Sequence, residues 1–302
     1  MKPTDLPEIK WVRKIDPELD LHWRYLYRLT NEAVSKWTLT VDQYAKDLKQ
    51  DISLEDIQRS VESGDPAGTV DRIGWTAADE GFKAATTPLF VTALARSGNA
   101  EIQRLKLAMR FDLDNPYVFG WIDTHTAELV VQVTGETKKA IAGVIREAFI
   151  NGDPPRKSAQ VIRGLVGLTE RDSKAVLNYW RTVASDGNRS AKTAESMADT
   201  YGRKLLRRRA ETIARHETVS AANQGVLRSY NQAEEQGLML STTMKEWIAA
   251  ADSPRTCLRC LAMDGVKVPI GAPFVTDIGL ISGPPLHVLC RCATTAITEI
   301  PT

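Results

Sequence analysis

The sequence predicts a mainly α-helical protein whose chain ends in a small α+β module clamped by cysteine and histidine side chains. Up to Gln236, apolar residues recur mostly at steps of three and four, which is the spacing of one helix face. Glycine and proline become frequent, and apolar residues fall into short runs, only after Gly237. All four cysteines lie between positions 257 and 292, so the clamp is expected in this last region.

The composition is that of a water-soluble globular protein. Hydrophobic residues make up 43% of the 302 positions and charged residues 25%, so the chain can bury a core without cross-links. Lys and Arg total 39 against 38 for Asp and Glu. Long-range attraction to nucleic acid or to an anionic membrane is therefore not a property of the whole chain, and any such binding must be local.

Targeting signals are not visible in the sequence. The N-terminus lacks the apolar stretch of an export signal, and no apolar run approaches the ~18 residues of a membrane span. We expect synthesis in the cytoplasm and no membrane contact. Thiols stay reduced in that compartment, which favours metal binding over disulfides.

Residues 1–111 are expected to form a helical docking region. Its clearest pattern runs from 19 to 37, with Asp16 as a candidate N-cap and Pro17 at the first helical position. Two shorter helices should follow, each opened by a Ser or Thr with an acid or amide three residues on. These pairs are Thr40 with Gln43 and Ser53 with Asp56, and Gly64 with Pro66 should end the second helix.

The rest of this region is also expected to be helical, but interrupted. Helix-forming residues dominate from 75 to 107. Pro88 and the sequence Ser97-Gly98-Asn99 are predicted to break the helix, because proline lacks the amide hydrogen and the second sequence is typical of turns.

Residues 112–297 are expected to form a second, mainly helical domain, followed by a tail at 298–302. The polar segment from Asp112 to Pro116 marks the boundary. Helical spacing then predicts four helices, over 124–151, 158–164, 169–185 and 191–236. Residues 240–297 form the Cys/His module, where short strands and loops are favoured.

The cysteines and one histidine have the spacing of a metal site. Cys257 and Cys260 form a Cys-x2-Cys pair, and 26 residues later the sequence His287-x2-Cys290-x-Cys292 follows. Such a pair directs two thiolates at one ion, and Cys290 and Cys292 in an extended chain point to the same face. Five ligands exceed the four of tetrahedral zinc, so His287 is a ligand or a hydrogen-bonding partner of a thiolate. We expect Zn²⁺, with a disulfide or free buried thiols as alternatives.

The sequence around this site does not indicate catalysis. A structural zinc has no open coordination position, and no glutamate stands near the cysteines or His287 to act as a general base. The nearest acids are Asp252, Asp264 and Asp277. We interpret Asp264-Gly265 as a turn between two short strands, with glycine supplying the positive φ.

Two charged segments of the long helix at 191–236 are candidates for other roles. Five cations stand within seven residues: Arg203, Lys204, Arg207, Arg208 and Arg209. They form either a solvated helix face or a local site for phosphates or for an acidic protein surface. In Arg215-His216-Glu217, adjacent side chains point about 100° apart, which favours a structural role over a catalytic dyad.

The C-terminal residues resemble the phage Mu F-like family, the minor head or head morphogenesis proteins of tailed bacteriophages. The resemblance extends over about 115–297 and is most specific in the C-terminal pattern. The matching residues are Arg215, Glu217, Trp247, Asp252, Arg255, Asp264, Gly265, Pro284, Pro285, His287, Cys290 and Cys292. Members commonly carry Pro-Asn where Val288-Leu289 stand here, and many lack the pair equivalent to Cys257 and Cys260.

This resemblance implies a virion protein with no catalytic residues. It implies attachment to the portal protein and other head proteins inside the capsid, a role in head assembly, and contact with packaged double-stranded DNA. The rival hypotheses are a metal-dependent nuclease or hydrolase that uses the Cys/His cluster, and a cytoplasmic adaptor with a zinc module. The nuclease needs a second histidine-rich group, and only His22, His125 and His216 remain.

Overall fold

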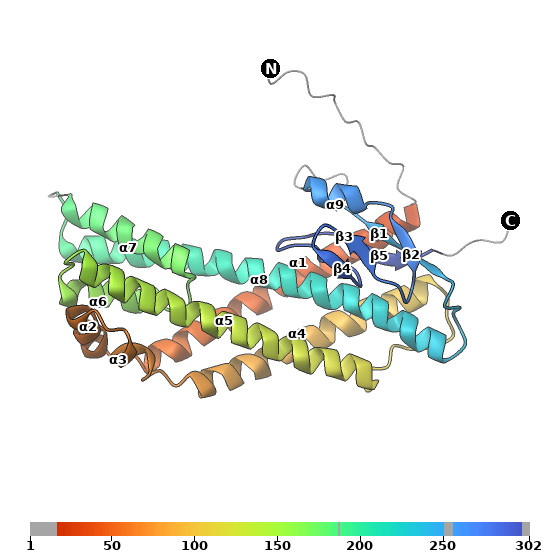
Figure 1. Ribbon diagram of the computed structural model, residues 1–302, viewed down its shortest axis with the longest axis horizontal. Coiled ribbons are helices and arrows are strands. Elements are labelled where there is room, and N and C mark those ends of the chain that lie inside the picture. The colour runs from red at the N-terminus through yellow and green to blue at the C-terminus, as the bar shows by residue number, and fades with distance from the viewer. Residues whose placement is uncertain (1–16, 187, 251–255, 298–302) are drawn as a thin grey trace, which may run out of the picture. The chain divides into compact units, whose positions relative to one another are not determined.

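The computed structural model describes residues 17–186, 188–250 and 256–297, and most of them are helical (Figure 1). The helices are α1 (Pro17–Gln50), α2 (Leu54–Ser63), α3 (Ala67–Val70), α4 (Trp75–Arg104), α5 (Pro116–Ile150), α6 (Pro155–Gly164), α7 (Glu170–Ser185), α8 (Ala191–Glu235) and α9 (Leu258–Met263). The strands are β1 (Met244–Ile248), β2 (Lys267–Pro269), β3 (Phe274–Thr276), β4 (Gly279–Ile281) and β5 (Ala293–Ala296). The predicted fold class is confirmed. No helix in this described part has the length and apolar character needed to cross a bilayer.

Several helix ends follow local signals in the sequence. The Ser53 hydroxyl accepts a hydrogen bond from the Asp56 amide at 3.0 Å and so caps α2, and Gly64 ends that helix with a φ of 72°. Thr169 caps α7 in the same way. The helices expected over 158–164, 169–185 and 191–236 correspond to α6, α7 and α8. Side-chain caps and left-handed glycines act locally, so the sequence alone predicts them.

Other expected helix ends are wrong. Thr40 lies inside α1, where its hydroxyl donates to a carbonyl one turn back. Helix α4 continues through Pro88 and through Ser97-Gly98-Asn99. The Ser97 and Asn99 side chains bond to carbonyls of the preceding turn, and the Phe111 ring occupies the space where Gly98 lacks a side chain. Tertiary packing therefore overrides the turn propensity of these residues.

The polar segment at 112–116 does interrupt the helices, but α5 begins at Pro116 and not at Thr124. The Asn115 side chain accepts a hydrogen bond from the Tyr117 amide at 3.0 Å. Asn115 and Pro116 thus occupy the positions that favour a capping amide and a first-turn proline.

Contacts divide the chain into two compact units. Unit 1 combines residues from 1–32, 90–118 and 215–302, and unit 2 combines 33–89 and 119–214. Each unit therefore draws on both sides of residue 112. The linear domain boundaries expected from the sequence remain a prediction.

Unit 2 is helical and contains polar contacts within its apolar core. The Tyr44 hydroxyl lies 2.8 Å from that of Thr134, which also donates to Asp79 at 2.6 Å. The Arg181 guanidinium pairs with Asp153 at 2.6 Å and so ties α7 to the loop before α6. These partly buried contacts join segments that are far apart in sequence.

Unit 1 contains the C-terminal strands. Three of them form an antiparallel sheet in the order β2-β1-β5, with Trp247 opposite Thr294, and β3 and β4 form a separate hairpin. Alternate residues of β1 face opposite sides. Trp247 packs in an apolar cluster with the cysteines, whereas Ile248 packs with residues of α1 and α8. The central strand is therefore buried on both faces.

A buried carboxylate fastens β5 to the helices of unit 1. Glu101 of α4 is fully buried and accepts hydrogen bonds from the Tyr230 hydroxyl at 2.6 Å, the Ala296 amide at 3.0 Å and the Thr295 hydroxyl at 3.0 Å. Arg104 donates to the same carboxylate at 2.8 Å and also to the Ala296 carbonyl at 2.6 Å. One side chain of α4 thus connects α8 with the last strand.

The negative charge of the Glu101 carboxylate is stabilised by nearby cations and hydrogen-bond donors. Burial alone would raise the pKa of Glu101, but the charges of His22 and Arg104 and the donated hydrogen bonds lower it to about 2. Burial also lowers the pKa of His22, in spite of the attraction of Glu101. Arg104 is therefore the cation that persists at neutral pH.

Candidate metal centre

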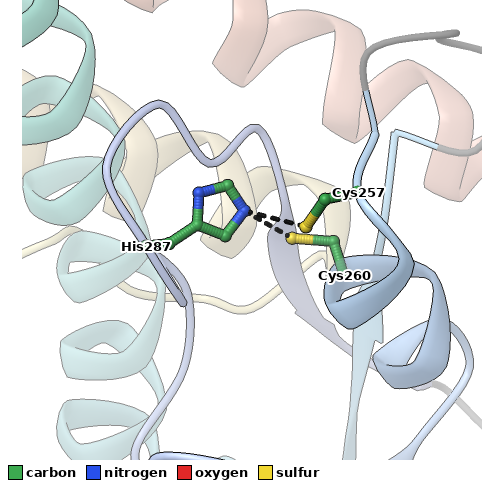
Figure 2. Close-up of side chains that lie close together, drawn as sticks. All are labelled: Cys257, Cys260 and His287. Atoms are coloured by element: carbon green, nitrogen blue, oxygen red, sulfur yellow. Dashed lines mark hydrogen bonds between the residues drawn. The ribbon is translucent and has the colours of Figure 1, made fainter.

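Helix α9 places Cys257 and Cys260 side by side. Cys257 is the N-cap residue, with an extended backbone, and Cys260 lies in the first turn. The Leu261 amide donates to the Cys257 carbonyl at 3.0 Å and closes that turn. Both sulfur atoms point at the same ring nitrogen, with His287 Nε2 lying 3.2 Å from Cys257 Sγ and 3.1 Å from Cys260 Sγ (Figure 2).

A tight turn between β4 and β5 carries His287 and Cys290. The Cys290 amide donates to the His287 carbonyl at 3.0 Å, and Leu289 has a φ of 64°. This is the pattern of a turn whose third residue is left-handed, where proline at the second position and asparagine or glycine at the third are favoured. Val288 and Leu289 occupy these two positions, so the turn forms without proline or asparagine.

The turn also fixes the tautomer of the histidine. His287 Nδ1 lies 2.6 Å from the Val288 carbonyl oxygen. A carbonyl only accepts hydrogen bonds, so Nδ1 is the protonated nitrogen. In the neutral ring, the lone pair of Nε2 therefore points at the two thiols.

All five predicted ligands come together in unit 1. Cys257, Cys260 and His287 form one group whose ligand atoms lie within 4.8 Å of one another, and Cys260, Cys290 and Cys292 form a second. The Cys260 and Cys290 sulfur atoms are 3.8 Å apart, far beyond the ~2.05 Å of a disulfide. All four cysteines are unbridged, so the disulfide alternative is absent from this structure.

The cluster is buried and has little free space. Cys260, Cys290 and Cys292 are 2%, 2% and 3% exposed, and the cavity beside them measures about 10 Å³ among the described residues. The same core contains the ring of Trp247, which packs edge-on against Phe274 with centroids 5.3 Å apart. These residues form an apolar shell around the sulfur atoms.

Proton sharing among the sulfurs limits their negative charge. Hydrogen bonds from Cys260 and Cys292 lower the pKa of Cys290, whereas the hydrogen bond with Cys290 raises the pKa of Cys260. Contact with both neighbours likewise raises the pKa of Cys292. The cluster holds one thiolate easily and resists a second beside it. A divalent cation removes that repulsion, so the donor set suits a metal ion.

The Asp264-Gly265 turn is only partly as predicted. Gly265 has a φ of 78° as expected, and its amide donates to the Trp247 carbonyl at 2.9 Å. The turn joins α9 to β2, however, and not two strands. Asp264 also accepts a hydrogen bond from the Ala249 amide at 2.9 Å. The Asp264-Gly265 turn therefore holds the end of α9 against the sheet. Pro284 and Pro285 lie in the loop before His287, and Asp252 and Arg255 lie outside the described residues.

The basic run does not act as one surface. Arg209 is 7% exposed and binds Glu136 at 2.7 Å and the Gly167 carbonyl at 2.5 Å within unit 2. It is therefore unavailable to an outside partner, which corrects the sequence prediction for this residue. Arg203 and Arg207 are exposed but pair with acids one turn away, at 3.1 and 3.2 Å. Lys204 and Arg208 are exposed as well.

Residues 215–217 lie on α8. Glu217 is 6% exposed, and Arg215 lines a cavity of about 30 Å³ with Trp23 and Tyr27. The assignment of a structural role to this segment remains a prediction.

Two residues that support the module were not found from the sequence. The Asn223 side chain accepts from the Thr294 amide at 2.9 Å and donates to the Cys292 carbonyl at 3.3 Å, and Glu101 holds the end of β5. Each lies at least 69 positions from its partner, so no local pattern could have revealed them.

Comparison with known proteins identifies the family. The family described as Phage Mu protein F like protein matches residues 139–295, just over half of the chain, and the match includes the whole Cys/His cluster. No curated protein and no solved structure matches the chain significantly. The resemblance seen in the C-terminal sequence is confirmed, and this chain belongs to the phage Mu F-like family.

Proposed function

We propose that the chain is a minor head protein of a tailed bacteriophage that works in head assembly, at the portal vertex, without catalysing a reaction. The observation that carries this proposal is the family match over residues 139–295. It covers the basic helix, the Cys/His cluster and all but the last residue of the sheet. The portal protein and other head proteins would then be its partners.

The form of the cluster supports a structural role. Its cavity of about 10 Å³ has room for a water molecule at most and not for a substrate. The candidate ligand groups among the described residues contain cysteine and histidine and no carboxylate. A catalytic metal would need an open position and a base close to it. The nuclease hypothesis is accordingly the less favoured one.

Contact with packaged DNA would fall to the exposed cations of α8. Arg203 and Arg207 already pair with acids, so Lys204 and Arg208 are the cations that we assign to DNA phosphates. Two such contacts give a weak interaction with a shallow salt dependence and no sequence preference. This matches a protein that touches DNA inside a full head without selecting a site.

Virion membership is tested in a phage that carries this gene. Purified heads analysed by mass spectrometry should contain the chain at low copy, and cross-linking should connect it to the portal protein. Deletion of the gene should yield defective heads, and the intact gene supplied in trans should restore them. Absence of the chain from purified heads, together with normal heads after deletion, would refute the proposal.

Two further measurements separate the remaining alternatives. The purified chain should not cleave DNA in the presence of Mg²⁺ or Zn²⁺, and sustained cleavage that disappears in His287→Ala would establish the nuclease instead. Binding of duplex DNA at low salt should weaken in the Lys204→Glu/Arg208→Glu variant. The matched control is Lys36→Glu/Lys157→Glu, which changes the net charge equally at exposed positions elsewhere in unit 2. Equal loss in both variants would mean that the helix holds no DNA site.

A further inference from the structure

We propose that one Zn²⁺ binds to Cys257, Cys260, His287 Nε2 and Cys290, and that Cys292 is not a ligand. The five candidates of the sequence thus reduce to four. The assignment rests on the two turns that carry these residues and does not depend on the proposed role in the virion.

The four ligands are two matched pairs, each spaced by two residues on a closed turn. The Leu261 amide closes the turn of Cys257 and Cys260, and the Cys290 amide closes the turn of His287 and Cys290, both at 3.0 Å. Each turn directs its first and fourth side chains to one side, which is the arrangement by which structural zinc sites gather their ligands. The two pairs meet across the cluster, because Cys260 contacts both His287 and Cys290.

Three of the ligand-to-ligand distances are close to those around a tetrahedral ion, whereas Cys290 Sγ lies more than 4.8 Å from at least one of Cys257 Sγ and His287 Nε2, so the two turns would draw together on the ion. With zinc–sulfur bonds of about 2.3 Å, two thiolates lie about 3.8 Å apart, and the Cys260 and Cys290 sulfurs are separated by 3.8 Å. A thiolate and an imidazole nitrogen lie about 3.5 Å apart around the same ion. The two contacts of His287 Nε2 are 3.2 and 3.1 Å, so the ring needs to retreat by only a few tenths of an ångström.

The histidine is prepared to be a ligand through Nε2. Its Nδ1–H donates to the Val288 carbonyl at 2.6 Å, and metal-binding histidines commonly donate their other ring N–H to such an acceptor.

Cys292 is held in a different manner. Its carbonyl is bound by Asn223 of α8, and the next residue, Ala293, is the first of β5. Its backbone is therefore fixed to the sheet, whereas Cys290 shares a turn with His287 and moves together with it. Cys292 lies within 4.8 Å of Cys260 and Cys290, and because its backbone is held by α8 and the sheet we assign it as a buried thiol beside the ion.

Metal analysis of the full-length chain, purified with a reductant, tests the assignment. We expect one zinc per chain in the wild type and in Cys292→Ser. Cys257→Ser, Cys260→Ser, Cys290→Ser and His287→Ala should each lose bound zinc at equimolar chelator. His287→Cys should recover it, because a fourth thiolate completes the tetrahedron. Circular dichroism checks that each variant keeps its helices. Only α9 carries any of the ligands, so the other helices should be retained.

Cobalt substitution counts the sulfur ligands independently. The wild type and Cys292→Ser should give the same tetrahedral spectrum, and His287→Cys should show stronger thiolate-to-cobalt charge transfer because it adds a cobalt–sulfur bond. Loss of metal in Cys292→Ser with retention in His287→Ala would overturn the assignment in favour of a four-cysteine site. Failure of the reduced wild type to bind either metal would overturn the site altogether.

Discussion

The left-handed turn at Leu289 gives a sharp prediction about stability. Leu289 has a φ of 64° and a side chain that is 48% exposed. Replacement of Leu289 by asparagine or glycine would relieve the strain of the left-handed backbone. It would also remove the apolar contacts of the half-buried leucine side chain, so the gain and the loss in stability would partly cancel. Comparison of Leu289→Gly with Leu289→Ala avoids this, because both variants lose the same apolar contacts beyond Cβ.

The magnitude follows from the backbone alone. A residue with a Cβ pays about 1–2 kcal/mol in the left-handed region, and glycine pays nothing there. Glycine loses about 0.5–1 kcal/mol more conformational entropy on folding than alanine. We therefore expect Leu289→Gly to be more stable than Leu289→Ala by about 0.5–1 kcal/mol.

The neighbouring position provides the control. Val288 is not among the positive-φ residues of the described chain, so Val288→Ala should be more stable than Val288→Gly by about 0.5–1 kcal/mol. The assay is hydrogen exchange of the amides in 286–296, supported by urea unfolding of the whole chain. If alanine is as stable as glycine at position 289, the interpretation of this turn is wrong.

Three further changes test the buried contacts. Glu101→Gln removes a charge that Arg104 compensates and should destabilise the chain by about 3 kcal/mol in urea unfolding. The pKa of Glu101 is lowered to about 2, from an ordinary carboxyl pKa of 4.5. The contribution of its charge to folding stability is therefore complete above pH 4.5 and is lost as the pH falls toward 2. Between these pH values, the urea midpoint of the wild type should fall more than that of Glu101→Gln. Arg209→Met should cost about 1–3 kcal/mol because it leaves the buried Gly167 carbonyl without its donor, while Glu136 is 42% exposed and can be solvated; Arg208→Met should stay within about 0.5 kcal/mol by thermal unfolding. Gly225→Ala would place a Cβ against the backbone of Leu94 and should lower stability by about 1–3 kcal/mol, measured in the same way; unchanged unfolding would show that α4 and α8 can separate there.

Much of the helical architecture was predictable because its signals are local. The Ser53 cap and the left-handed Gly64 act within a few residues of the helix end that they specify. The continuity of α4 was not predictable in this way. Gly98 suits a turn when it is considered alone, and it remains helical because the Phe111 ring packs on it from another segment.

The meeting of the five candidate metal ligands was predictable for a related reason. Spacing by two residues places two side chains on one side of a turn, whatever the rest of the fold does. The choice of four ligands that we propose was not predictable, since it depends on which residues are held by the sheet. Cys292 is fixed through Asn223, and a contact between residues 69 positions apart leaves no local pattern.

The segment that matches the family is not the segment that forms a compact unit. The match runs from 139 to 295, yet the module packs on residues that precede it. Leu26 and Leu29 of α1 share an apolar cluster with Ile248 and Ala293. Glu101 of α4 receives three hydrogen bonds from Thr295 and Ala296, and Ala296 lies beyond the match. A chain reduced to the matched residues would expose this apolar face and leave the end of β5 without its carboxylate, so the N-terminal helices, for which the sequence offered no motif, complete the core of the C-terminal module.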